Sequence, residues 1–129
     1  MTYEYTIPCI PPSLNQFAGR ENVWKYRQTK AEWLQIVNAY CRPRPAEPIE
    51  KAVVTLEYHF PDDRRRDPDN YIKLLMDGLV AAKVIKDDCF DCIELRLKQG
   101  ETNKHRPHVF VTVVKKGETP CLSIDPKSL

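Results

Sequence analysis

Glycine is scarce in this sequence, and long apolar runs are missing from it. Only four of the 129 residues are Gly, so the sequence has no glycine-rich loop of the kind that cradles phosphate groups. No segment approaches the ~20 consecutive apolar residues that a membrane-spanning helix requires, and we expect no membrane partner. The first twelve residues lack a basic segment followed by an apolar one. This excludes a typical secretory signal and favours a cytoplasmic location.

Neither cysteine content nor net charge places the chain in a special class. The five Cys residues are odd in number and irregular in spacing, which is typical of reduced thiols rather than of a disulfide framework. Lys and Arg total 20 against 18 Asp and Glu, and the resulting charge of +2 excludes a uniformly basic nucleic-acid coat protein. Hydrophobic residues make up 42%, which is enough for one packed core at this length.

Hydrophobic periodicity predicts a single small α/β (α+β) domain over residues 1–116 and a loose tail at 117–129. Its mixed sheet has about four strands, with two helices packed on it. Residues 13–28 are polar and basic and are expected to form a loop. Thr29 and Glu32 then make a capping-box pattern, which predicts a helix from residue 30. In chain order we expect a strand at 3–10, a helix at 30–41, a strand at 51–60, a helix at 70–82, and strands at 93–98 and 108–114.

Aspartate is distributed unevenly. Residues 1–60 contain no Asp, whereas eight of the nine lie between positions 61 and 100. Asp holds its oxygens close to the backbone, which suits helix caps, turns and hard-metal sites. The eight are Asp62, Asp63, Asp67, Asp69, Asp77, Asp87, Asp88 and Asp91.

Part of this cluster lies at the expected start of the second helix. Pro68 favours an extended residue before it and suits the first helical position, so we expect the helix to open here with Asp67 extended. Asp69, Lys73 and Asp77 then lie at i, i+4 and i+8, on one face of the helix. The sequence therefore predicts two carboxylates at the helix mouth with an ammonium group one turn inward.

Asp88 can join this corner by chain length alone. A helix of ~13 residues runs ~20 Å, and six extended residues retrace ~20 Å; alternatively, a symmetry-related subunit supplies Asp88. Converging carboxylates suit Mg²⁺, which favours oxygen ligands and assists phosphodiester cleavage. Lys73 would add positive charge near the developing oxyanion. Arg64–Arg66 would hold the flanking phosphates without reading sequence.

Each acid also has an ordinary structural role open to it. Asp67 as N-cap and Asp69 in the first turn make a common helix start, Asp87 and Asp88 suit a plain turn, and the Arg run suits a solvated loop. The clustering of so many Asp residues favours the metal interpretation over these separate explanations.

The chain also carries an extended motif. It consists of Arg64-Arg65-Arg66-Asp67-Pro68-Asp69-Asn70, then Lys73, Asp77-x-Leu79 and Ile85-Lys86-Asp87-Asp88. This motif resembles the signature of the RusA family of Holliday junction resolvases. The segment Pro11-Pro12-Ser13-Leu14-Asn15 is similar to the N-terminal segment of that family, and the resemblance covers about residues 3–115.

The resemblance implies a homodimeric, Mg²⁺-dependent endonuclease that cuts four-way DNA junctions symmetrically in recombination and repair. Mn²⁺ is the expected substitute, and members are often encoded by prophages. Asp67, Asp69 and Asp88 would be catalytic metal-binding carboxylates, Lys73 the catalytic lysine and Asp87 a further candidate ligand for the metal. Members usually have Gly where this chain has Lys83, at the end of the helix, where a left-handed residue is common.

Several polar side chains are candidates for contacts to DNA. A basic, aromatic stretch lies within residues 13–30, with a solvated loop as the alternative and core packing as the alternative for Trp24. The residues that we expect to contact DNA are Arg64, Arg65, Arg66, Asn15, Arg20, Lys25 and Arg27.

A second pattern, Cys89-x2-Cys92 followed by His105-x2-His108, approximates a zinc-finger spacing. The two His residues are too close together for that motif, and Arg106-Pro107 between them disfavours a helix. We therefore do not expect these four residues to form a structural zinc site.

The sequence favours a Mg²⁺-dependent Holliday junction resolvase that acts as a symmetric dimer on branched DNA. Two alternatives remain open at this point. One is another metal-dependent phosphohydrolase acting on RNA or nucleotides through the same carboxylates. The other is a non-catalytic DNA-binding module in which the Asp cluster serves only as caps and turns.

Overall fold

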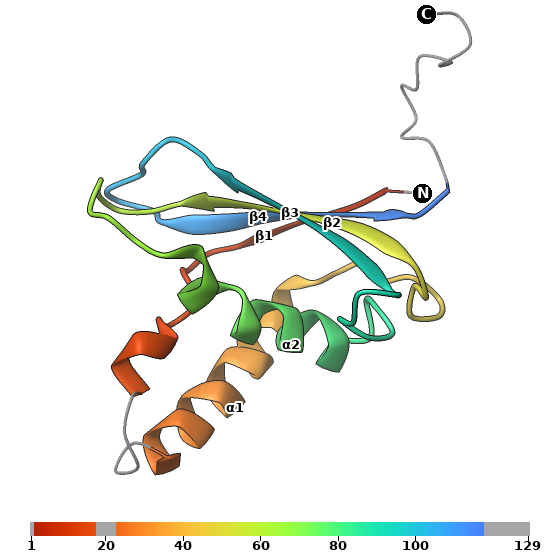
Figure 1. The fold of residues 1–129 in the computed structure, drawn as a ribbon, viewed down its shortest axis with the longest axis horizontal. Coiled ribbons are helices and arrows are strands. Elements are labelled where there is room, and N and C mark those ends of the chain that lie inside the picture. Colours follow the sequence, from red (N-terminus) through yellow and green to blue (C-terminus); the bar gives the residue numbers. More distant parts are fainter. Residues whose placement is uncertain (1, 18–22, 118–129) are drawn as a thin grey trace, which may run out of the picture.

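The computed structural model describes residues 2–17 and 23–117. Arg20 and most of the expected tail lie outside these residues. Within these residues, four strands, two α-helices and two 3-10 turns follow one another (Figure 1). They are β1 (Thr2–Ile7), η1 (Leu14–Phe17), α1 (Val23–Tyr40), β2 (Ala52–His59), η3 (Pro68–Tyr71), α2 (Lys73–Ala81), β3 (Ile93–Gln99) and β4 (His108–Lys115). This order confirms the predicted mixed α+β domain.

The strands form one mixed sheet in the order β1-β4-β2-β3. β4 pairs antiparallel with both β1 and β2, whereas β2 and β3 are parallel. Parallel strands need a crossover connection, and α2 supplies it. Both α-helices cover the same face of the sheet (Figure 1). Among the described residues, neither helix combines the length and the apolar character that crossing a membrane requires.

The core lies between this sheet face and the helices. Burial alternates along β2 and β4, as period-2 strands with one covered face require. α2 contributes a buried stripe that includes Leu75 and Leu79, both fully buried. Since burial of one such side chain stabilises a fold by about 1.5–3 kcal/mol, this layer holds α2, and the polar residues at its start, against the sheet.

The two helices approach closely where Gly78 of α2 faces Val37 of α1. A Cβ built on Gly78 would lie 2.8 Å from a methyl carbon of Val37, so only glycine permits this packing. Beside it, the Trp33 indole N–H donates a hydrogen bond to the Leu74 carbonyl over 3.0 Å. α1 and α2 are thus locked together near the start of α2.

The prediction for the first helix was wrong at its beginning. α1 starts at Val23, not at residue 30, so Thr29 lies inside the helix and no capping box forms there. Residues 14–17 form η1 rather than open loop. The beginning was missed because only Trp33 and Val37 of this helix are buried, which leaves its first turns without an apolar stripe.

The end of α2 uses an unusual residue. Lys83 has φ 63°, in the left-handed region that normally favours glycine. Its N–H donates to the Val80 carbonyl, and the Val84 N–H donates to the Leu79 carbonyl, each over 3.0 Å. These two bonds form the Schellman pattern, in which Gly is the usual residue at the position of Lys83. α2 therefore has an ordinary C-terminal cap, but the backbone of Lys83 is strained.

Candidate active site

The entry to α2 has the predicted conformation. Asp67 is extended, with φ −92° and ψ 125°, and stands at the N-cap of η3, with Pro68 at its start. The Asn70 N–H donates to the Asp67 carbonyl over 3.1 Å. The Asp67 side chain makes no capping hydrogen bond, and Asp69 is exposed like Asp67. Both carboxylates are therefore accessible to solvent, and the Asp67 side chain does not cap the helix.

Lys73 lies one step further, at the start of α2. Its Nζ donates to Asp77 Oδ1 over 3.1 Å, and Lys30 Nζ of α1 lies 3.2 Å from Asp77 Oδ2. The Asp77 hydrogen bond, then the Asp77 charge, raise the pKa of Lys73, and the charges of Asp88 and Tyr26 raise it further. These interactions favour the ammonium form of Lys73 further. The sequence did not predict that Lys30 pairs with Asp77 or that Tyr26 acts on Lys73, because no local pattern links α1 to α2.

Asp88 returns toward this corner from the far side of α2. The segment before it is fixed by a bridge between Ile49 and Ile85 and by a hydrogen bond from the Lys86 N–H to the Ile49 carbonyl. Asp88 itself is half-buried, and its charge acts on Lys73. The structure therefore brings Asp88 within electrostatic range of the start of α2, as the chain-length argument allowed.

The three expected metal-binding carboxylates do not converge on one point within a single copy. Within residues 2–17 and 23–117, just one group of three Asp, Glu, His or Cys side chains has its ligand atoms within 4.8 Å of one another, and it consists of Asp87, Cys89 and Cys92. Asp87 Oδ1 accepts a hydrogen bond from the Asp88 N–H over 2.7 Å. Asp87 thus faces the cysteines, and its expected part as a Mg²⁺ ligand stays a prediction.

The N-terminal segment reaches the same corner. A cavity of about 170 Å³ lies between it and the entry to α2, and its lining includes Ser13, Asn15, Asp67 and Asn70. Two parts of the sequence motif that are more than fifty residues apart thus share one hollow. This juxtaposition places Asn15 beside Asp67, where a bound polar group could meet both.

Residues 11–114 match the family model described as Endodeoxyribonuclease RusA. The chain belongs to this family. It is also 32% identical over 89 residues to a crossover junction endodeoxyribonuclease rusA of Enterobacteria phage HK97, an alignment that covers 67% of this chain and 73% of the phage protein. The matched range spans Asp67, Asp69, Lys73 and Asp88, whose roles as site residues stay predictions.

The three arginines before Asp67 differ in their surroundings in this RusA-family chain. Arg66 is only 9% exposed, hydrogen-bonds to Asp62 Oδ1 over 2.7 Å, and stacks its guanidinium 4.3 Å from the centre of the Phe60 ring. The side chains of Arg64 and Arg65 are 78% and 93% exposed. Arg66 therefore anchors the loop, and Arg64 and Arg65 present their charge to solvent.

The N-terminal turns of α1 carry the other basic residues of the RusA-family chain. Lys25 and Arg27 are exposed, and Trp24 is 83% exposed, which excludes the alternative that Trp24 fills a core gap. The contacts between α1 and α2 lie further along α1, at Lys30, Trp33 and Val37. The basic residues thus project from a helix rather than from the expected loop. Arg20 lies outside the described residues.

The four residues of the zinc-finger-like spacing do not gather. Cys92 precedes β3, whose first residue, Ile93, pairs with Ala52 of β2. His108 pairs with His59 at the opposite end of β2. Eight strand residues span ~23 Å at about 3.3 Å each, so the cysteines and His108 lie at opposite ends of the sheet. This confirms the expectation that the four do not form one zinc site.

Proposed function

We propose that this RusA-family chain is a Mg²⁺-dependent endodeoxyribonuclease that cuts Holliday junctions symmetrically. One observation carries the proposal: residues 11–114, which span Asp67, Asp69, Lys73 and Asp88, match the endodeoxyribonuclease family model. The similar phage protein is named as a crossover junction endodeoxyribonuclease, which supports branched DNA as the substrate.

The donor atoms present fit a hard divalent cation. Asp67 and Asp69 are exposed and Asp88 is half-buried, so all three offer carboxylate oxygens, the ligands that Mg²⁺ prefers. A bound Mg²⁺, with Mn²⁺ as the expected substitute, would supply Lewis-acid charge at the scissile phosphate. We assign the ion to these three residues.

Lys73 serves the same reaction as a fixed cation. Lysine is an ammonium ion at neutral pH, and the raised pKa of Lys73, caused first by the hydrogen bond with Asp77, extends that charged form to more alkaline pH. A positive charge held in place before the reaction stabilises the negative charge that develops on the attacked phosphate. We therefore assign Lys73 to the non-bridging oxygens of that phosphate.

The exposed basic residues would hold the DNA on either side. Arg64 and Arg65 lie directly before Asp67, while Lys25 and Arg27 project from the first turns of α1. Contacts of this kind bind phosphates and position the strand without selecting sequence. Asn15 shares a cavity with Asp67, which makes it the candidate of the N-terminal segment for a DNA contact at this place.

Symmetric cutting requires two equivalent sites, and a two-fold homodimer is the simplest assembly that supplies them. Because Asp67, Asp69 and Asp88 do not converge within one copy, the origin of Asp88 can be tested by mixing Asp69→Asn and Asp88→Asn chains. If Asp88 acts across the dimer, each mixed dimer has one intact site and nicks the junction. If Asp88 acts within its own chain, the mixture stays inactive.

The direct test is cleavage of a synthetic four-way junction with Mg²⁺, compared with linear duplex, RNA and nucleoside triphosphates. We expect selective junction cleavage that Asp69→Asn and Asp88→Asn abolish while junction binding persists. Asp63→Asn, which removes the same charge from an exposed residue nearby, should cut normally. Hydrolysis of RNA or nucleotides instead would favour a different phosphohydrolase, and binding without any cleavage would favour a DNA-binding module.

A further inference from the structure

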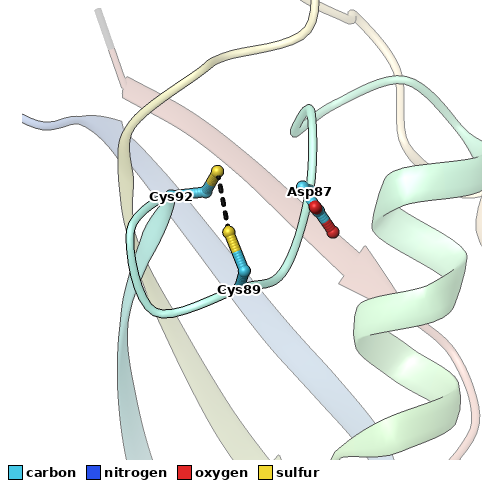
Figure 2. Close-up of side chains that lie close together, drawn as sticks. All are labelled: Asp87, Cys89 and Cys92. Carbon is cyan, nitrogen blue, oxygen red and sulfur yellow. Dashed lines mark hydrogen bonds between the residues drawn. The ribbon is translucent and has the colours of Figure 1, made fainter.

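A compact group of two thiols and one carboxylate lies immediately beside Asp88. The ligand atoms of Asp87, Cys89 and Cys92 all fall within 4.8 Å of one another. Figure 2 shows the two sulfur atoms facing each other across a short turn, with Asp87 at their side. The Sγ atoms are 3.1 Å apart, and Asp87 and Cys89 are exposed. The group is therefore open to an ion from solvent.

The backbone fixes the two cysteines on one side of that turn. The Cys92 and Ile93 N–H groups both donate to the Cys89 carbonyl, over 3.0 and 3.1 Å, and the Cys92 carbonyl accepts from the Ala52 N–H over 2.8 Å. Cys92 is thus tied to the sheet, and Cys89 is tied to Cys92. A metal would meet two ligands already positioned and would order few further groups on binding.

The third ligand is positioned as well. Asp87 Oδ1 accepts a hydrogen bond from the Asp88 N–H over 2.7 Å. Such a bond orients a ligating carboxylate and leaves its second oxygen available to an ion. Lys86, the basic residue next to Asp87, lies 3.5 Å from Glu50 and so already has an acidic partner.

We propose that Asp87, Cys89 and Cys92 form a Zn²⁺ site, separate from the Mg²⁺ site assigned to Asp67, Asp69 and Asp88. Thiolates bind Zn²⁺ and are poor partners for Mg²⁺. Two sulfurs at roughly 2.3 Å from one tetrahedral ion are roughly 3.8 Å apart, so the present pair has to open by only about 0.7 Å. A water molecule would complete the four-coordinate shell.

Zinc at this position would act on the loop that carries Asp88. On its near side the loop is held by the hydrogen bond from Lys86 to Ile49, and on its far side by that from Ala52 to Cys92. A metal bound to Asp87, Cys89 and Cys92 would cross-link the loop between these two hydrogen bonds. The site is thus a structural clamp next to a proposed catalytic carboxylate.

The experiment uses the full chain, purified under reducing conditions, loaded with Zn²⁺ and titrated against a chromophoric chelator. We expect about one Zn²⁺ per wild-type chain, almost none in Cys89→Ser or Cys92→Ser, and binding weakened roughly tenfold or more in Asp87→Asn. Cys9→Ser is the matched control and should bind as the wild type does, because Cys9 lies near Pro107 at the other end of the sheet. Co²⁺ loading should give thiolate charge-transfer absorption that the two Ser variants lose.

Two further measurements keep this result apart from the proposed nuclease activity. Asp69→Asn should retain its Zn²⁺, and millimolar Mg²⁺ should not displace the ion. The proposal is overturned if the wild type takes up no Zn²⁺, or if the Ser variants retain it. It is also overturned if Cys89 and Cys92 are recovered as a disulfide that binds no metal after reduction. Undiminished affinity in Asp87→Asn would overturn the three-ligand assignment.

Discussion

Lys73 donates a hydrogen bond to Asp77, one turn further along α2, over 3.1 Å. The other oxygen of Asp77 lies 3.2 Å from Lys30 of α1, and the Asp77 side chain is only 16% exposed. One largely buried carboxylate thus holds two ammonium groups from different helices. Sequence spacing placed Asp77 on the face of Lys73, but Lys30 joins it only through the packing of α1 on α2.

Removing the charge of Asp77 should change the pH dependence of cleavage. Asp77 is the largest cause of the raised pKa of Lys73, so Asp77→Asn should lower that pKa. If the reaction uses the ammonium form, activity at alkaline pH should then be lost at a lower pH than in the wild type. The pH profile of junction cleavage measures this, with Asp63→Asn as the charge-matched control. An unchanged alkaline limb would contradict the role of Asp77 in positioning Lys73.

The same substitution should weaken DNA binding at Arg65 but lower the stability of the fold at Arg66. Arg65 is 93% exposed, so Arg65→Gln should weaken junction binding and reduce its salt slope by about 1 without altering Tm. Arg66 is packed on Phe60 and bonded to Asp62, so Arg66→Gln should destabilise the fold by about 1 kcal/mol or more. Salt-dependent binding and thermal unfolding of both variants test the contrast, and equal effects on Tm would contradict it.

Lys83→Gly should stabilise the protein. Lys83 has φ 63°, and a side chain in this region costs roughly 1 kcal/mol relative to glycine. We expect urea denaturation to show a gain of about 1 kcal/mol, with an unchanged m-value. Lys83→Ala keeps the Cβ and so should give little of this gain. A destabilised Gly variant would show that the Lys83 side chain contributes more than its backbone strain costs.

Stability should fall at alkaline pH through two buried groups. Burial raises the pKa of Tyr5 from 10.0 to about 12 and that of Cys41 from 9.0 to about 11. The fold favours the protonated form of each, so the stability they contribute is complete below their ordinary pKa and is lost as the pH rises toward the raised one. For Tyr5 this window is pH 10 to about 12.

The variant Tyr5→Phe isolates that contribution. It removes the titrating hydroxyl and its 2.7 Å hydrogen bond to the Pro43 carbonyl, so stability at neutral pH should fall by about 1 kcal/mol. Above pH 10, the free energy of unfolding should decline less steeply than in the wild type, while the Cys41 contribution remains. Urea denaturation across this range is the measurement, and identical slopes would contradict the assignment.

Periodic burial made most of the fold predictable. β2, β3 and β4 were predicted to within about a residue at each end. One covered sheet face imposes alternating burial on β2 and β4, whereas burial does not alternate along β3. Pro68 marked the opening of η3 for a local steric reason, whereas α2 begins at Lys73 and not at residue 70 as predicted. The start of α1 was predicted seven residues too late, at residue 30 instead of Val23, since its exposed first turns have no apolar stripe to detect.

The candidate site was likewise predictable only in part. The sequence by itself determined the residue types and the motif around Asp67, Lys73 and Asp88, since local spacing and chemistry suffice to recognise a family. Only the tertiary structure decided that Arg66 is an anchor, that Asn15 shares a hollow with Asp67, and that Asp87 faces two cysteines. The reason is physical. Asn15 and Asp67 are far apart in sequence and meet only through the packing of the fold, whereas the contacts of Arg66 and Asp87 depend on the backbone path of their loops, which residue spacing does not encode.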